Sequence, residues 1–176
     1  VAFLKFWADA APGGSSLVKS IARLPPMEGV ARLDDTTLVM WPTPARGDVF
    51  DISLRLADAL RRQTTRRYGQ SLDTLPGILL FPGRIRRVET RVEAIPDVLF
   101  EDLKQRRPHL APGTLVLTGY AASWLSGRFE LSGVGSFEGP SGRRVPLLEL
   151  EDENPDPRPW HNPSLFGRHS EIPRHG

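Results

Sequence analysis

The chain contains no cysteine among its 176 residues, which excludes disulfides and thiolate-bound metals and is typical of proteins from a reducing compartment. It also lacks an apolar run long enough to cross a bilayer. A secretory signal pattern is missing, because Lys5 and Asp9 interrupt the short apolar stretch at the start. These absences predict a cytoplasmic protein that does not act at a membrane.

Several catalytic motifs are missing as well. There is no Gly-x-Ser-x-Gly, no Walker A sequence and no pair of histidines at helical spacing. Three of the four histidines, His161, His169 and His175, fall near the end without the spacing of metal ligands. The formal net charge is only +2. A serine hydrolase, a zinc protease and a P-loop enzyme within this chain are therefore not expected.

The pattern of apolar residues predicts one α+β domain over residues 1–150, followed by a change of character over 151–176. Strands are expected at 2–8, 30–33, 37–41, 77–81, 84–95, 114–117, 128–134 and 145–150, and helices at 15–23, 48–66, 97–107 and 120–125. Ser15 or Ser16 is the expected cap of the first helix. Residues 151–159 are acidic and rich in proline, which favours a stiff linker.

The most informative stretch is a hairpin over residues 30–41. Two runs of residues that suit a pleated sheet flank Asp34-Asp35-Thr36, and aspartate suits a turn. The pattern therefore predicts two antiparallel strands with a pair of carboxylates at the tip. Those carboxylates either hold a metal ion or only form the turn.

This hairpin resembles the central hairpin of class III adenylate/guanylate cyclase domains, which reads Lys-Thr-Leu-Gly-Asp-Gly-(apolar)-Leu-Ala-Val-Phe. Here Ala-Arg-Leu-Asp-Asp-Thr-Thr-Leu-Val-Met-Trp (31–41) overlies it without a gap. Pro-Gly-Thr-Leu-Val-Leu-Thr (112–118), Leu-Ser-Gly-Arg-Phe-Glu-Leu (125–131) and Arg-Val-Pro-Leu-Leu-Glu-Leu (144–150) follow in the family's order. The resemblance implies a ferredoxin-like αβ sandwich of the nucleotide cyclase type, with a mainly antiparallel sheet, helices on one face, and pairing into dimers.

The resemblance also implies a metal site. The family holds two divalent cations, Mg²⁺ or Mn²⁺, with two carboxylates. Asp35 falls on the second carboxylate, and Trp7 falls on the first in a gapless overlay, so Asp9 replaces it only with a two-residue slip. The candidate metal ligands are thus Asp9 and Asp35. The candidate nucleotide- or phosphate-binding residues are Gly13, Gly14, Ser15 and Lys104.

Six positions depart from the family's pattern. Ala31 replaces the lysine that contacts the base, Asp34 and Thr36 replace two glycines, and Phe100 and Lys104 replace the asparagine and arginine that contact ribose and phosphate; Trp7 replaces the first carboxylate. Phenylalanine forms no hydrogen bond with a ribose, and lysine lacks the planar fork of arginine. These changes favour a degenerate, non-catalytic cyclase-like domain in a bacterial signalling protein, for which no cofactor is expected.

Other interpretations stay open at this point. One is an active, divergent adenylate cyclase that uses Asp9 and Asp35 with two divalent metals to convert ATP to cAMP. Another is a basic phosphate- or nucleic-acid-binding module, because arginines cluster at 61–67, 84–91 and 143–144. The sequence Leu-Phe-Gly-Arg-His-Ser-Glu-Ile (165–172) resembles the start of the P-loop ATPase modules that follow cyclase domains. The expected partners are a second copy of the chain or an adjacent domain, with a nucleotide as a further candidate ligand.

Overall fold

A computed structural model describes residues 1–44 and 47–151 of the chain. The strands are β1 (Ala2–Phe6), β2 (Val30–Asp34), β3 (Thr37–Met40), β4 (Ile78–Pro82), β5 (Arg84–Val88), β6 (Arg91–Ile95), β7 (Leu115–Thr118), β8 (Leu131–Glu138) and β9 (Arg144–Leu150). The helices are α1 (Gly14–Ala22), α2 (Val49–Tyr68), α3 (Val98–Gln105) and α4 (Gly119–Ser123), with short 3-10 turns η1 (Ala8–Ala10) and η2 (Leu72–Thr74). No described helix has the length and apolar character needed to span a membrane.

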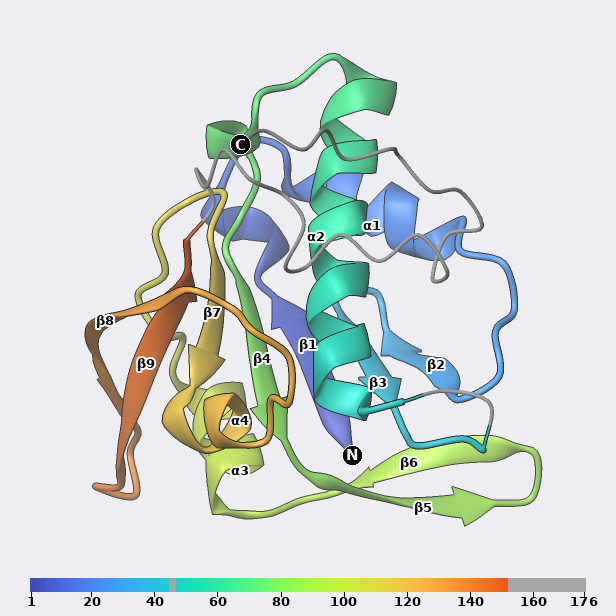
Figure 1. The fold of residues 1–176 in the computed structure, drawn as a ribbon, viewed down its shortest axis with the longest axis vertical. Coiled ribbons are helices and arrows are strands. Elements are labelled where there is room, and N and C mark those ends of the chain that lie inside the picture. Colours follow the sequence, from blue (N-terminus) through green and yellow to red (C-terminus); the bar gives the residue numbers. More distant parts are fainter. Residues whose placement is uncertain (45–46, 152–176) are drawn as a thin grey trace, which may run out of the picture.

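Seven strands form one sheet in the order β2-β3-β1-β4-β7-β9-β8 (Figure 1). Its neighbours pair antiparallel except β4 and β7, which run parallel. The central strands β1, β4 and β7 are almost wholly apolar, as expected of strands buried on both faces. The predicted fold class, a mainly antiparallel α+β sandwich, is confirmed.

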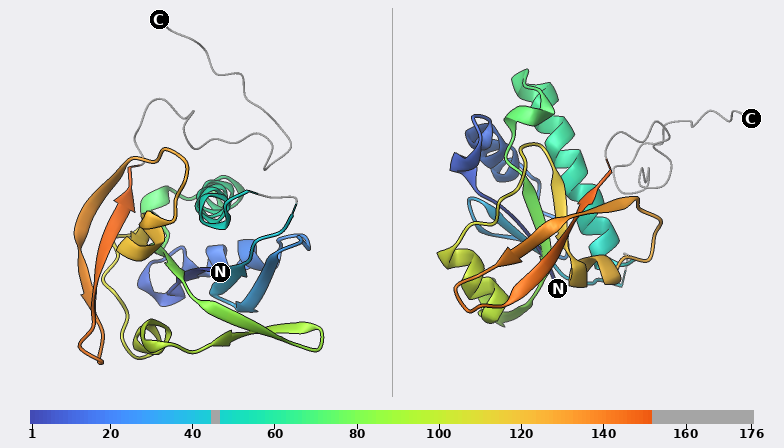
Figure 2. Two further views of the ribbon diagram at one scale, coloured as in Figure 1. Left: turned by 60° about the horizontal axis from the view of Figure 1, so that its bottom comes forward. Right: turned by 90° about the vertical axis from the view of Figure 1, so that its left-hand side faces the viewer.

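The alternation of side chains along β1 divides the core into two layers. Leu4 and Phe6 join a cluster with α1, α2 and α4, whereas Phe3 joins a second cluster with Leu99 and Leu103 of α3. Three helices therefore cover one face of the sheet. On the other face lie α3 and the β5–β6 hairpin, as the left view of Figure 2 shows.

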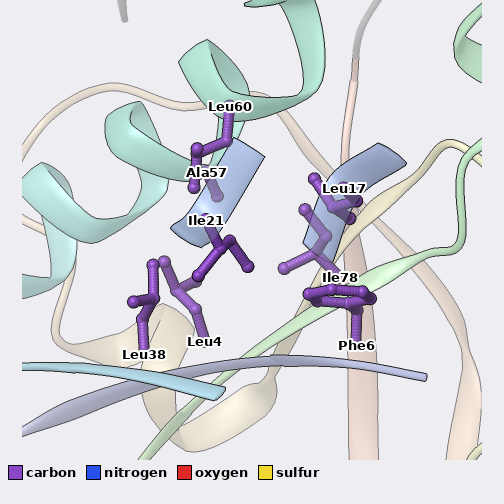
Figure 3. A pocket seen from close by; sticks show the side chains of 8 residues that line it. All are labelled: Leu4, Phe6, Leu17, Ile21, Leu38, Ala57, Leu60 and Ile78. Carbon is purple, nitrogen blue, oxygen red and sulfur yellow. The ribbon is translucent and has the colours of Figure 1, made fainter. Parts of the chain in front are cut away.

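Helix α2 covers the centre of the sheet. Its buried positions follow helical spacing, and it ends at Gly69, whose φ of 64° suits glycine at the end of a helix. Beneath it the packing leaves a void of about 10 Å³ lined by eight apolar side chains, including Leu4, Leu17 and Leu60 (Figure 3). Because the void is this small and its lining side chains are apolar, a water molecule would find no hydrogen-bond partners there, so we expect the void to be dry.

Two local predictions are wrong. The stretch 84–95, expected as one strand, is the β5–β6 hairpin, because Glu89 adopts a φ of 58° and reverses the chain between Val88 and Arg91. Helix α1 begins at Gly14 after Gly13, with no serine side chain capping it. The predicted linker and the resemblance to an ATPase module fall, after Glu151, outside the described residues.

Candidate functional site

The end of β1 and the tip of the β2–β3 hairpin lie side by side. Lys5 pairs with Thr37 in the antiparallel register, and the Phe6 N–H donates to the Thr36 carbonyl at 3.1 Å. Continuing this register sets Trp7 opposite Asp35. The structure thus brings together the two chain segments on which the resemblance places the carboxylates of a metal site.

At the hairpin tip, one aspartate forms the turn and the other faces solvent. Asp34 Oδ1 accepts hydrogen bonds from the Thr36 N–H at 2.9 Å and from the Thr36 hydroxyl at 3.2 Å, the pattern of an Asx turn. The Asp35 side chain is 77% exposed, and its Oδ1 lies 4.0 Å from Arg32 Nη1. Asp35 is therefore a free-standing carboxylate with one weakly held arginine beside it.

Lys5 is a site residue that the sequence reasoning missed. Its ammonium donates to the hydroxyls of Thr36 and Thr37, each at 3.2 Å, and lies 5.4 Å from the centre of the Trp7 ring. Burial lowers the pKa of Lys5 below its ordinary value, and the nearby charge of Asp34 opposes that shift. The available signal was a lysine inside the apolar run 2–6. A positive charge thus already occupies the base of the hairpin tip.

Asp9 contacts an arginine from a distant part of the chain. It lies in η1, its side chain is 75% exposed, and its Oδ2 accepts from Arg107 Nη2 at 3.1 Å. Arg107 follows α3 and, with Trp7 and His109, lines an open cleft of about 440 Å³. The two candidate metal ligands therefore contact different arginines, Asp9 contacting Arg107 and Asp35 contacting Arg32.

The candidate phosphate-binding glycines pack against neighbouring backbone. The Gly13 N–H donates to the Thr74 carbonyl at 2.7 Å, and the Gly14 N–H donates to the Ala11 carbonyl at 3.1 Å. Gly14 is buried, and a Cβ atom there would collide with the Ala8 carbonyl. Close packing of α1 against η1 is enough to require glycine at this position. Ser15 is exposed on the first turn of α1.

Helix α3 presents a packing residue and an exposed cation at the family's ribose and phosphate positions. The Phe100 ring lies 5.7 Å from the Phe3 ring, and the Phe100 N–H donates to Asp97 Oδ1 at 2.8 Å. Lys104 Nζ lies 5.7 Å from the Phe100 ring centre and 3.8 Å from Glu101 Oε1. Ala31 is partly buried against the same cluster.

Among residues 1–44 and 47–151, no group of three or more His, Asp or Glu side chains gathers closely enough to hold a metal ion. What the site offers instead is an aromatic wall at Trp7, a lysine ammonium beneath the hairpin tip, and two exposed carboxylates. These groups can form surface contacts and bind charged ligands.

The sequence matches no family model and no curated protein. Solved structures do match in shape. The adenylyl cyclase CyaB from P. aeruginosa aligns with a TM-score of 0.52 at 14% identity, covering 88% of this chain and 94% of that one. The guanylate cyclase domain of RhGC from Catenaria anguillulae, solved in complex with GTP, aligns with a TM-score of 0.52 at 11% identity, covering 85% and 93%. At these identities the likeness is one of fold: the chain is folded like a nucleotide cyclase domain.

Proposed function

We propose that this domain is a non-catalytic regulatory relative of nucleotide cyclase domains, acting through contact with a second copy or with an adjacent domain of a longer bacterial signalling protein. One observation carries the proposal. Trp7 follows the end of β1, where the β1–β3 register continues to Asp35, and the Lys5 ammonium is hydrogen-bonded at the base of the same hairpin tip. An aromatic ring and a cation thus stand where the cyclase pattern needs a carboxylate.

A pair of divalent cations does not fit this set of side chains. Mg²⁺ and Mn²⁺ are held by oxygen ligands, of which Trp7 has none. The Lys5 ammonium adds a positive charge that repels a cation at the hairpin tip. Asp9 and Asp35 each contact an arginine instead. These side chains therefore support no metal-assisted step.

The groups at the ribose and phosphate positions support the same proposal. Phe100 packs on Phe3 and has no side-chain donor or acceptor. The N–H groups of Gly13 and Gly14 are engaged by carbonyls within the fold. An active cyclase would need new hydrogen-bond partners at each of these places.

The basic-module alternative receives less support from the arginine-rich hairpin. Arg86 and Arg91 pair with Glu93, at 3.2 and 3.3 Å, and the Arg87 guanidinium lies 5.1 Å from the Trp41 ring centre. Two of the hairpin's arginines thus share one glutamate and a third lies over a ring, which weakens the field that they present to a phosphate backbone. We therefore do not adopt nucleic-acid binding as a second function.

The surface beside the site supports pairing with a second copy. Trp7, Ala31 and Leu33 lie on the α3-bearing face of the sheet, and each is only partly buried. Since β2 is an edge strand of the sheet, this apolar strip reaches the rim of the molecule. Partly exposed apolar residues grouped at a rim are suited to contact with another protein surface.

The catalytic part of the proposal is tested by product formation. The chain is incubated with ATP or GTP and Mn²⁺, and cyclic nucleotide is measured by chromatography. We expect no product above a protein-free control, and no difference between the parent and Asp35→Asn. Product from the parent that disappears in Asp35→Asn would instead establish the active cyclase. Nucleotide binding without turnover, measured by calorimetry, would fit a sensor.

The pairing part is tested by sedimentation. We expect a concentration-dependent monomer–dimer equilibrium that Leu33→Arg weakens at least tenfold. Val134→Arg is the matched control, because Val134 is a 46% exposed apolar residue on β8, the opposite edge strand. A parent chain that stays monomeric at 100 times the protein concentration of the cyclic-nucleotide assay would contradict pairing. Equal losses in the two variants would contradict the assigned face.

A further inference from the structure

An aromatic slot lies at the end of the sheet where β1 begins, away from Trp7 and the hairpin tip. It is an open cleft of about 430 Å³ whose lining includes Phe50 and Asp48 near the start of α2, and Tyr120 and Trp124 around α4. Figure 1 shows the start of α2 and α4 at this same end of the molecule. The aromatic slot is defined here by these four residues.

The rings of the slot are held in fixed positions yet remain exposed. Trp124 stacks on Phe50 with ring centres 6.3 Å apart and planes 18° apart, and Tyr120 meets Trp124 edge-on at 74°. The Thr118 hydroxyl caps α4 by accepting from the Ala121 N–H at 3.2 Å. Despite this order, Tyr120 is 63% exposed and Trp124 is 55% exposed. Large aromatic side chains kept rigid and uncovered by the described residues are typical of a binding surface.

A carboxylate stands at the rim of the slot. Asp48 precedes α2, lines the cleft, and accepts a hydrogen bond from the Ser126 hydroxyl through one of its two oxygens, Oδ2. Paired aromatic rings with a nearby acid form the combination that receives proline-rich segments carrying an arginine. The prolines lie against the rings, and the arginine faces the acid.

The chain itself carries such a segment directly after the described residues. Residues 154–160 read Asn-Pro-Asp-Pro-Arg-Pro-Trp. Alternating prolines restrict both their own φ and the residue before each of them, which favours the extended polyproline II helix. With three residues per turn, Pro157 and Trp160 fall on one side and Pro155 and Arg158 on another.

The segment starts close enough to reach the slot. Gly119, the first residue of α4, packs against Pro146 of β9. From Pro146 to Glu151 the chain advances five residues, roughly 17 Å in a strand. A polyproline II helix of nine residues, the number from 152 to 160, spans roughly 28 Å. The segment is therefore long enough to return along β9 to the level of α4.

We propose that residues 154–160 dock in the aromatic slot as a polyproline II segment, with Pro157 and Trp160 against Tyr120 and Trp124, and with Arg158 facing Asp48. Because the segment is tethered to β9, a contact too weak to hold a free peptide suffices to hold it. Docking would set the direction in which the chain leaves the domain. The proposal stands whether or not the domain turns over a nucleotide or pairs with a second copy.

The absence of native cysteine makes a spin-label test direct. One label is placed on α2 at Gln63→Cys, an exposed helical position, and the other beside Trp160 at His161→Cys. In the full chain, electron–electron double resonance is expected to give one narrow distance distribution. Trp124→Ala, and separately the pair Pro157→Ala and Pro159→Ala, should at least double its width. Added salt should broaden the distribution of the parent, because it screens the pair of Arg158 with Asp48, and should leave the already broader distribution of Arg158→Gln unchanged. Val134→Ala, the matched control at an exposed apolar residue outside the slot, should leave the width unchanged.

The proline variant alters only the segment, so it tests docking even if Trp124→Ala perturbs the fold. A broad distribution in the parent would overturn the proposal. So would a narrow distribution that survives both the Trp124→Ala and the proline substitutions. Diluting the labelled chain tenfold with unlabelled chain should leave the distance signal unchanged; a loss of signal would show that the segment of another molecule occupies the slot and would overturn docking within one chain.

Discussion

Two groups of carboxylates in this protein have opposite surroundings. Asp51 on α2 and Asp102 on α3 are 6% and 4% exposed, and both fasten loops from distant parts of the chain. Asp9 and Asp35, the candidate metal ligands, have side chains that are 75% and 77% exposed and contact one arginine each. The acids with the most hydrogen bonds are therefore those that hold the scaffold together, not those at the candidate site.

The Asp51 carboxylate fixes the turn after α4. Its Oδ1 accepts from the Ser126 N–H at 2.9 Å, and its Oδ2 accepts from the Gly127 N–H at 2.8 Å and the Ser126 hydroxyl at 3.1 Å. Asp102 does the same for the β8–β9 turn, accepting from the Ser141 N–H at 3.1 Å and the Ser141 hydroxyl at 2.5 Å. Hydrogen bonds from backbone N–H groups to a charged carboxylate are stronger than those between two neutral groups.

The contrast bears on function, because a metal site needs acids that are ordered and otherwise unpaired. In this domain the ordered carboxylates are those of Asp51 and Asp102, which hold loops against helices. Firmly anchored loops together with exposed site carboxylates are what we expect if the domain has the proposed role of a scaffold for surface contacts. The four predictions below test that difference, starting with the largest expected effect.

The largest effect is expected from a third buried acid, Asp58. It pairs with the buried guanidinium of Arg61 at 2.7 Å, and Arg61 also donates to the Gly113 carbonyl, tying α2 to the turn before β7. Arg61→Ala leaves Asp58 buried with a smaller share of its countercharge, so we expect a loss of about 3–5 kcal/mol in the free energy of unfolding. Urea titration measures it.

Arg62→Ala is the matched control for this prediction. Arg62 contacts the same carboxylate at 3.0 Å, but its side chain is 40% exposed, so its removal should cost less than about 1 kcal/mol. Equal losses in the two variants would show that burial does not distinguish them. The expected link between burial of an ion pair and its contribution to stability would then fail where the largest difference is expected.

The next effect is expected at Asp51. Asp51→Ala leaves the N–H groups of Ser126 and Gly127 without their acceptor, and removes one of the two carboxylates that share the Ser126 hydroxyl proton, so we expect a loss of about 2–4 kcal/mol. Asp48→Ala, one helical turn earlier, removes one bond to the Ser126 hydroxyl and should cost about 1 kcal/mol. Urea titration of both variants distinguishes a specific anchoring role of Asp51 from a general sensitivity of the start of α2 to substitution.

The sequence predicted the parts of the fold that depend on local patterning. The hairpin tip was predicted because Asp34, Asp35 and Thr36 interrupt two strand-like runs, and turn chemistry acts over a few residues. The long helix was predicted because its apolar residues recur at helical spacing. The order of motifs along the chain then led to the cyclase-like fold, which the structure confirms.

The contacts that Asp51 and Asp9 make could not be predicted from the sequence, because they join residues that are far apart in the chain. The bond between Asp51 and Gly127 spans 76 positions, and the one between Asp9 and Arg107 spans 98. A lone aspartate in a helix gives no local sign of which loop it will meet. Lys5 was missed for a related reason, since its two threonine partners come from the neighbouring strand. The roles of Asp9 and Asp35 as ligands stay predictions.

A smaller effect is expected at Lys5, which lies between the two groups in burial. Lys5→Met removes the hydrogen bonds to Thr36 and Thr37 and should cost about 1 kcal/mol near neutral pH. The matched control is Lys104→Met, since Lys104 is an exposed lysine with one ion pair at 3.8 Å. Its substitution should change stability by less than about 0.5 kcal/mol.

The Lys5 ammonium also predicts a pH dependence. Burial sets its folded-state pKa below the ordinary value of 10.5, so between these two values the unfolded chain binds more protons than the folded one. Stability then rises with pH across that window and is constant below it. The advantage of the parent over Lys5→Met should therefore grow as pH rises toward 10.5. A difference that shrinks over this range would contradict the direction of the shift.

The smallest effect is expected at the candidate metal ligands. Asp9→Asn and Asp35→Asn remove exposed charges whose arginine partners are screened by solvent, so each should change the free energy of unfolding by less than about 0.5 kcal/mol. The melting temperature should also respond equally to Mn²⁺ in the parent and in both variants, because a ligand stabilises only the state that binds it. A Mn²⁺-dependent rise that either substitution abolishes would place an ordered metal site among the exposed acids, and the contrast between the two groups of carboxylates would no longer separate scaffold from site.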